Sequence, residues 1–490
     1  MLKSLFVRLT TILMGNSVSK ALLLSFEFLL ASQGAAQYGL FSINLAVILI
    51  ISNFVLIGLN YGVVRFLAIY QKYDQPGKIT ILIQSNILFV GMLSIAVSLI
   101  VVLFSDILAL RLFGKPDLRT PLLIAGLIIP FEAENQLMSA IFRGLRKFKK
   151  HVLVSDFIRN FFLALSIPII LFFDYSIIKI LITFLFGSVL GCLYGFYELR
   201  KDVFSPLKIR KLISMLKNNL SFTYLLFAWN IFQKTAGQGQ TILAGIFLTE
   251  GEVGILSIFI RMTMILTFFQ SGVNQSLLVE FSALDETNEG NRLKRIYRRS
   301  TEILLLLSIF ITIPIAVNPG YILSFFGDIY LDYKWWVLPI IFAQVINVGT
   351  GPIGQVLISQ GKHISIITSS ILGSVVQIIM FVTLAPIMGL PGAVISKASS
   401  SILMTVTRHI FSKKLLDISF LNKMLIYMLL GGGLAILLGA NLVNKYISQR
   451  DIYLLGSLIS LAIFIVWVYL YAIINKGFKT RMMNIWRLFE

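Results

Sequence analysis

Apolar stretches long enough to cross a membrane follow one another along almost the whole chain. A spanning helix needs about 20 mostly apolar residues, and about fourteen such stretches fit between residues 12 and 475. Charged residues make up 13% of the 490-residue sequence, about half the share of a soluble domain. The sequence therefore predicts an all-α polytopic membrane protein with about fourteen transmembrane helices.

Lysine and arginine concentrate on one side of the predicted spans. If the N-terminus is cytoplasmic, 30 of the 42 Lys and Arg residues fall in cytoplasmic segments and six within spans. The outer loops hold only Arg111, Lys115, Arg119, Lys334, Lys445 and Arg450. Because positive loops stay in the cytoplasm, we expect both termini there, in a plasma or inner membrane. Topology and contact with anionic headgroups then explain most of the net charge of +20, without nucleic acid.

The two halves of the chain carry similar short motifs at a nearly constant offset. The matching positions are Asn16 and Asn230, Lys20 and Lys234, 38–42 (YGLFS) and 253–257 (VGILS), and Lys179 and Lys397. Six predicted spans separate equivalent points, so both halves have the same orientation. A pseudo-two-fold axis along the membrane normal should therefore relate them.

The repeat predicts four parts of the chain. Residues 1–200 form an N-terminal lobe of helices 1–6, and residues 201–218 a cytoplasmic linker. Residues 219–415 form a C-terminal lobe of helices 7–12, and residues 416–490 add two helices and a basic cytoplasmic tail. We expect the two six-helix lobes to face each other across a cavity at the membrane midplane.

Several motifs together resemble a known family. They are NSVSKALLLSFEFLLA, YGLFSINLA, GLNYGVVRFLA and FRGLRKFK in the first half, and GEVGILSIFIRM, TGPIGQVLISQGKH and MGLPGAVISKASS in the second. Over roughly residues 1–415 the sequence is similar to the polysaccharide-repeat flippases of the multidrug/oligosaccharidyl-lipid/polysaccharide exporter superfamily. The resemblance implies a two-lobed transporter that moves a polyprenyl-linked oligosaccharide from the inner to the outer leaflet. It carries over no catalytic residue.

Two lysines at matching positions are the first candidates for a binding site. Lys20 and Lys234 lie in predicted spans, where a charge costs a few kcal/mol or more. Asn16 and Asn230 precede them by one helical turn. With the resemblance, the lysines are predicted to hold the phosphates of the lipid carrier in a cationic cavity. The alternative is a stripe of hydrogen bonds between helices.

Three further cations complete the predicted substrate-binding set. Lys179 and Lys397 lie near the outer ends of matching spans, where they either form a second cationic pair or extend to the interface. Arg261 has no charged counterpart in the first half, and we expect it to contact a ligand.

Three carboxylates are candidates for H⁺ or Na⁺ coupling, because protonation relieves the cost of a carboxylate at membrane depth. Glu27 shares a helix face with Lys20, and a structural hydrogen bond is its alternative role. Glu132 lies on a polar face of the fourth predicted span, which must look into protein or water. Asp156 lies three residues before Arg159, a spacing typical of an intrahelical ion pair.

No cofactor, metal site or catalytic centre is predicted. The sequence has no phosphate-binding loop of the P-loop type, its three histidines are far apart in the predicted topology, and Cys192 is its single cysteine. Two other functions stay open: a multidrug or cation antiporter of the same fold, and a membrane glycosyltransferase or polysaccharide polymerase. The short outer loops argue against the enzymes. Glycosyltransferases and a polymerase are the expected protein partners.

Overall fold

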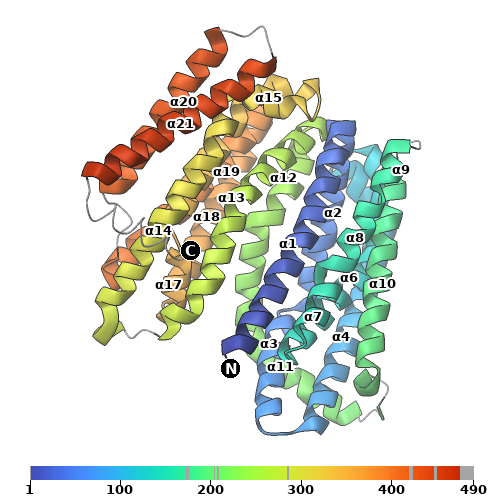
Figure 1. Cartoon of the computed structure of the whole chain (residues 1–490). Helices are drawn as coiled ribbons and strands as arrows, with labels where there is room; N and C mark the ends of the chain where they lie inside the picture. The colour runs from blue at the N-terminus through green and yellow to red at the C-terminus, as the bar shows by residue number, and fades with distance from the viewer. Residues whose placement is uncertain are drawn as a thin grey trace. The chain divides into compact units, whose positions relative to one another are not determined.

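The computed structural model describes residues 2–172, 176–203, 205–206, 209–283, 286–418, 423–445 and 450–474. Within these residues every regular element is helical, and no strand occurs (Figure 1). The predicted all-α class is therefore confirmed. The chain forms two compact units, Met1–Ser257 and Ile258–Glu490, which are described separately.

The first unit contains nine longer helices and several short segments among its described residues. The longer helices are α1 (Leu2–Gln33), α2 (Ala35–Leu56), α3 (Leu59–Lys72), α4 (Pro76–Leu103), α6 (Arg119–Gly144), α8 (Ile158–Leu165), α10 (Ile177–Val203), α11 (Ile209–Lys234) and α12 (Gln240–Phe247). The short segments are α5 (Ser105–Ile107), η1 (Leu108–Leu112), η2 (Pro116–Leu118), α7 (Phe148–Val152), η3 (Leu153–Phe157), α9 (Ile167–Phe172) and η4 (Thr235–Gly239).

Helix α6 forms the core of this unit, because α2, α3, α4 and α10 all pack against it. Leu137 and Phe142 on α6 are fully buried. Small residues bring the backbones close, as expected where packing rather than water drives helix association. Gly126 of α6 lies against α4, and its carbonyl oxygen accepts a hydrogen bond of 2.6 Å from Ser98 Oγ.

Two π-helical segments interrupt the expected helices. The fifth predicted span, residues 152–173, is a succession of α7, η3, α8 and α9 rather than one continuous helix. The other segment that interrupts a predicted span, η4, begins directly after Lys234. Such segments often occur at functional sites. Asp156 lies in η3, so one candidate residue comes from this irregular backbone.

The first turns of α2 and α13 (Glu250–Ala283) cross in very close contact. A Cβ atom added at Gly39 would lie 1.9 Å from the carbonyl oxygen of Glu250. A Cβ atom added at Gly254 would lie 1.9 Å from the carbonyl oxygen of Ala35. Gly39 and Gly254 match in the sequence repeat, as do Ala35 and Glu250. Such a reciprocal contact is what a two-fold axis between repeated segments produces.

Lys115 fastens the loop between α4 and α6 to the end of α12. Its side chain is buried, and Nζ donates hydrogen bonds to the carbonyl oxygens of Gly245 at 2.6 Å and Leu248 at 2.8 Å. Lysine stabilises the carbonyl end of a helix in this way. Burial lowers the pKa of Lys115, and the carboxylates of Glu250 and Glu252 partly oppose the shift.

Replacing Lys115 with methionine should cost about 1–3 kcal/mol of unfolding free energy, since buried carbonyl oxygens lose a charged donor. The unfolded chain binds the Lys115 proton more firmly than the folded chain does, because burial lowers the folded pKa. Stability from this residue should therefore rise with pH in the alkaline range below the ordinary lysine pKa, and Lys115→Met should remove that rise. Thermal unfolding in detergent against pH measures both effects. Arg111→Met, an exposed charge loss in the same loop, should change neither.

The second unit contains most of α13 and a further set of helices. They are α14 (Glu286–Val317), α15 (Pro319–Ser324), η5 (Asp328–Trp336), α16 (Val337–Gly349), α17 (Ile353–Ser359), α18 (His363–Met388), α19 (Leu390–Leu416), α20 (Lys423–Lys445) and α21 (Arg450–Ile474). Helices α18 and α19 pack against each other, and α20 and α21 lie side by side next to α14 (Figure 1). Trp467 Nε1 of α21 donates a hydrogen bond of 3.0 Å to the carbonyl oxygen of Tyr427 of α20.

Seven helices in the described part of the chain are long and apolar enough to cross a membrane, and two shorter apolar helices accompany them. The protein is therefore a multi-pass membrane protein, while the count of fourteen stays a prediction. In the predicted linker, only residues 204–208 separate α10 from α11. The lobe boundaries at residues 200, 219 and 415 also stay a prediction.

Candidate functional site

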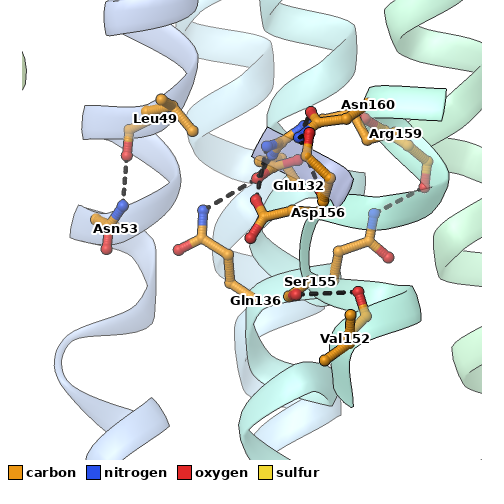
Figure 2. Close-up of polar contacts among 12 residues, drawn as sticks. Leu49, Asn53, Glu132, Gln136, Val152, Ser155, Asp156, Arg159 and Asn160 are labelled. Atoms are coloured by element: carbon orange, nitrogen blue, oxygen red, sulfur yellow. Dashed lines mark hydrogen bonds and ion pairs between the residues drawn. The ribbon is translucent and has the colours of Figure 1, made fainter. Parts of the chain in front are cut away.

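A buried arginine joins two carboxylates inside the first unit (Figure 2). Arg159 of α8 donates from Nη1 to Glu132 Oε1 at 2.6 Å and from Nη2 to Asp156 Oδ1 at 2.7 Å. Arg159 is 8% exposed and Glu132 of α6 is 1% exposed, whereas the Asp156 side chain is 52% exposed. The guanidinium is thus paired on its buried side with α6 and on its open side with η3.

Amide side chains extend this ion pair to neighbouring helices. Gln136 Nε2 donates to Glu132 Oε1 at 3.3 Å, and Arg159 Nε donates to Asn160 Oδ1 at 3.2 Å. Asn160 Nδ2 in turn donates to Ser19 Oγ at 3.0 Å and to the Ser19 carbonyl oxygen at 3.2 Å. The polar network therefore fixes α1 against α8 at the residue next to Lys20.

The network brings one predicted binding residue and two predicted coupling residues into the same region. Lys20 is exposed on α1, directly after the buried Ser19. Asp156 and Glu132 share Arg159 as their partner. A fixed cation between two carboxylates leaves one net negative charge, and that charge responds to protonation or to a bound cation.

The remaining predicted binding residues are more scattered. Lys179 is exposed on α10, and Lys397 of α19 is partly buried. Arg261 of α13 is partly buried, with Nη1 3.5 Å from Met264 Sδ. The side chains of Asn16, Asn230 and Lys234 lie outside the described residues. Their shared orientation toward one cavity therefore stays a prediction.

Glu27 of α1 is fully buried, and the preceding residue, Phe26, packs edge to face against Phe41 with ring centroids 5.4 Å apart. An acidic residue in these surroundings is rare unless it has a structural partner or a functional role. Its predicted part in ion coupling stays a prediction.

The sequence predicted part of this arrangement and missed its centre. The intrahelical pair of Asp156 and Arg159 is confirmed. The polar face of the fourth predicted span does look into protein: Asn135 donates to the Ser188 carbonyl oxygen at 2.9 Å, and Ser139 Oγ lies 2.7 Å from His151 Nδ1. The pairing of Arg159 with Glu132, 27 residues away on another helix, was missed. One indication of this pairing is present in the sequence: an arginine lies within an apolar stretch, and the preceding predicted span has a polar face with no assigned partner.

Among the described residues, no group of three or more His, Cys, Asp or Glu side chains is placed to hold a metal ion.

All-helical membrane proteins with buried charged side chains include the secondary transporters. Comparison with solved structures shows which proteins share this fold. The chain matches "Lipid II flippase MurJ, inward closed conformation" with a TM-score of 0.72 and 15% identity, covering 94% of this chain and 98% of that one. It matches an inward-facing multidrug resistance MATE family transporter of the MOP superfamily with a TM-score of 0.62 and 14% identity, covering 81% and 94%.

A third solved structure agrees. The MATE transporter VcmN of Vibrio cholerae, in its bent form, matches with a TM-score of 0.55 and 16% identity, covering 85% of this chain and 97% of that one. At these identities the likeness shows the fold, which the chain shares with these three transporters.

The family follows from the sequence. The family model described as "Polysaccharide biosynthesis protein" matches residues 10–267, more than half of the chain. The chain therefore belongs to the polysaccharide biosynthesis protein family. A search of curated proteins gave no match.

Proposed function

We propose that this protein is a flippase that moves a polyprenyl-(pyro)phosphate-linked oligosaccharide from the inner to the outer leaflet. The product would serve cell-surface polysaccharide biosynthesis. The family match over residues 10–267 carries this proposal, because it ties the chain to polysaccharide biosynthesis. The transporter fold shared with a structure titled as a lipid II flippase supports a lipid-linked cargo.

The proposed mechanism is alternating access with a cationic cavity. Lys20 and Lys234 hold the phosphates of the carrier lipid, with Asn16 and Asn230 beside them. Lys179, Lys397 and Arg261 add further positive charge for the same cargo. A lysine ammonium suits this task, because it is a mobile point charge that can release its ligand.

Proton or Na⁺ coupling is assigned to Glu27, Glu132 and Asp156. The two carboxylates that share Arg159 support this assignment, since one charge of the pair is not balanced by the guanidinium. The half-exposed Asp156 is the member that an incoming ion can reach, while the buried Glu132 keeps Arg159 in place.

The proposed setting is a plasma or inner membrane with both termini in the cytoplasm, as the distribution of Lys and Arg predicts. Two six-helix lobes, residues 1–200 and 219–415, would move against each other around the cargo. The glycosyltransferases and the polymerase that build the polysaccharide are the proposed partners, together with anionic membrane lipids.

A multidrug or cation antiporter is the second candidate function. The fold shared with multidrug resistance MATE transporters favours it. A cationic drug needs a cavity with surplus negative charge, whereas the proposed binding set here is cationic. Drug resistance on expression, with normal glycan export after deletion of the gene, would favour the antiporter.

The double variant Lys20→Ala/Lys234→Ala should reduce export of the glycan at least tenfold, because the carrier phosphates lose both counter-charges. The measurement is lipid-linked oligosaccharide on the inner leaflet of a deletion strain complemented with each variant. Lys20→Arg/Lys234→Arg should keep part of the activity, since it retains the charge. Lys217→Ala, an exposed charge loss on α11, serves as the control. Normal export by the double alanine variant at wild-type abundance would refute the lysine roles.

A further inference from the structure

One face of α14 carries an unusual concentration of positive charge. Four basic side chains and Asn291 line a depression of about 440 Å³. The basic residues are Lys294, Arg295, Arg298 and Arg299. Their spacing by three and four residues places them on one side of the helix.

The opposite side of α14 is held firmly, which makes the basic face a fixed platform. Leu293 is 1% exposed and Tyr297 is 2% exposed. Tyr297 Oη donates a hydrogen bond of 2.6 Å to the carbonyl oxygen of Thr350. The rotation of the helix about its axis is therefore set by packing, and the basic side chains cannot turn away together.

Half of the positive charge on this platform is not balanced within the described part of the chain. Lys294 Nζ lies 2.5 Å from Asp417 Oδ2, and Arg298 Nε lies 3.2 Å from Glu302 Oε1. Arg295 and Arg299 are exposed and form no ion pair with any described residue. Like charges four residues apart on a helix repel each other, and a bound anion would remove that repulsion.

The position of the cluster along α14 corresponds to the headgroup layer of a membrane. The helix from Arg299 to Val317 rises about 27 Å at 1.5 Å per residue, close to the hydrocarbon thickness of about 30 Å. Arg295 and Arg299 therefore lie where lipid phosphates lie. Guanidinium groups bind phosphate oxygens in a bidentate manner, which favours phosphate over other anions.

The same helix face continues into the membrane as an exposed apolar surface. Leu306 and Phe310 each lie eleven residues, about three turns, after Arg295 and Arg299 respectively, and so point in nearly the same directions. Leu306 is partly exposed and Phe310 is 43% exposed. Basic groups at headgroup depth, with exposed apolar side chains about 16 Å further along the same face, match one amphiphilic molecule, with a phosphate head and a hydrocarbon chain.

We propose that the α14 platform is a binding site for a phosphate-bearing membrane lipid, with the phosphate on Arg295 and Arg299 and the chain along Leu306 and Phe310. Two lipids share this chemistry: an anionic phospholipid of the bulk membrane and a polyprenyl phosphate. Asp417 competes with the phosphate for Lys294, so the site is partly self-neutralised when empty.

The test uses the full chain in nanodiscs of phosphatidylcholine, titrated with phosphatidylglycerol or with undecaprenyl phosphate while the thermal midpoint is followed. Arg295→Gln/Arg299→Gln should weaken lipid binding at least tenfold. Arg210→Gln/Lys211→Gln, which removes two exposed charges at the start of α11, should leave it within about twofold. Asp417→Asn should strengthen binding, because it releases Lys294.

The outcomes separate the two lipids and can overturn the site. Equal binding of both lipids, lost together in Arg295→Gln/Arg299→Gln, supports a general headgroup site, and binding of undecaprenyl phosphate alone supports a site for the carrier. Unchanged binding in Arg295→Gln/Arg299→Gln overturns the proposal. Inorganic phosphate that reproduces the full stabilisation overturns the lipid assignment, since a hydrocarbon chain would then contribute nothing. None of these outcomes depends on glycan export.

Discussion

Replacing Arg159 with methionine should lower the free energy of unfolding by about 3–5 kcal/mol, among the largest effects of any single substitution in the first unit. Arg159 is buried and binds Glu132 at 2.6 Å, so its removal leaves a buried carboxylate without its cation. Methionine has a similar length and fills the space, so the loss reports on charge rather than on a cavity. Thermal or denaturant unfolding in detergent micelles measures it.

A double-mutant cycle isolates the ion pair from the surrounding contacts. Glu132→Gln/Arg159→Met removes both charges and should recover most of the loss, because no uncompensated ion remains. Asp156→Asn removes the other partner of Arg159, but at a side chain that is 52% exposed. It should therefore cost about 1 kcal/mol or less. A single Arg159→Met variant as stable as Asp156→Asn would mean that water or another group already serves Glu132.

The Asp156→Asn variant also allows an effect on transport to be measured separately from an effect on stability. In the proposed coupling site, Asp156 is the accessible carboxylate and Glu132 the buried one. Asp156→Asn should therefore leave the fold intact while it changes the pH or Na⁺ dependence of export. If export by Asp156→Asn keeps the wild-type dependence on both ions, Asp156 carries no coupling ion.

The sequence predicted the class of fold well because the relevant signals are local. The length and apolar composition of a stretch are enough to predict that it crosses a membrane. Likewise, the three-residue spacing of Asp156 and Arg159 is enough to predict their ion pair. The pairing of Arg159 with Glu132 depends on how α6 and α8 pack, which no local pattern encodes. The π turn that places Asp156 at the open edge of the network is likewise a product of packing.

Lys115 is a second residue whose role depends on tertiary structure. By its place in the sequence it is one of six cations predicted in the outer loops, like Arg111 and Arg119. In the structure it is buried and binds carbonyl oxygens more than 120 residues away, whereas Arg119 forms an exposed ion pair with Asp106. Two cations in the same loop can thus have different roles: one binds the carbonyl end of a helix, and the other forms an exposed ion pair. Only the tertiary structure shows which cation has which role.

The glycine crossing of α2 and α13 should be the second position of large effect. Gly39→Ala and Gly254→Ala should each cost about 1–3 kcal/mol, the usual penalty of overpacking. Each new Cβ atom would lie 1.9 Å from a backbone oxygen, Glu250 for one and Ala35 for the other. Because backbone atoms cannot change rotamer, relief requires the two helices to move apart.

The combined variant tests whether the two glycines act as one contact. Once either alanine has separated the helices, the other meets less obstruction, so Gly39→Ala/Gly254→Ala should cost clearly less than the sum of the single variants. Gly272→Ala on α13 is the matched control, because no atom lies within 4 Å of its added Cβ, and it should be neutral or stabilise the helix by up to about 1 kcal/mol. Strictly additive costs would show that each glycine is packed independently of the other, and the two close approaches would then not form a single contact between the repeated segments.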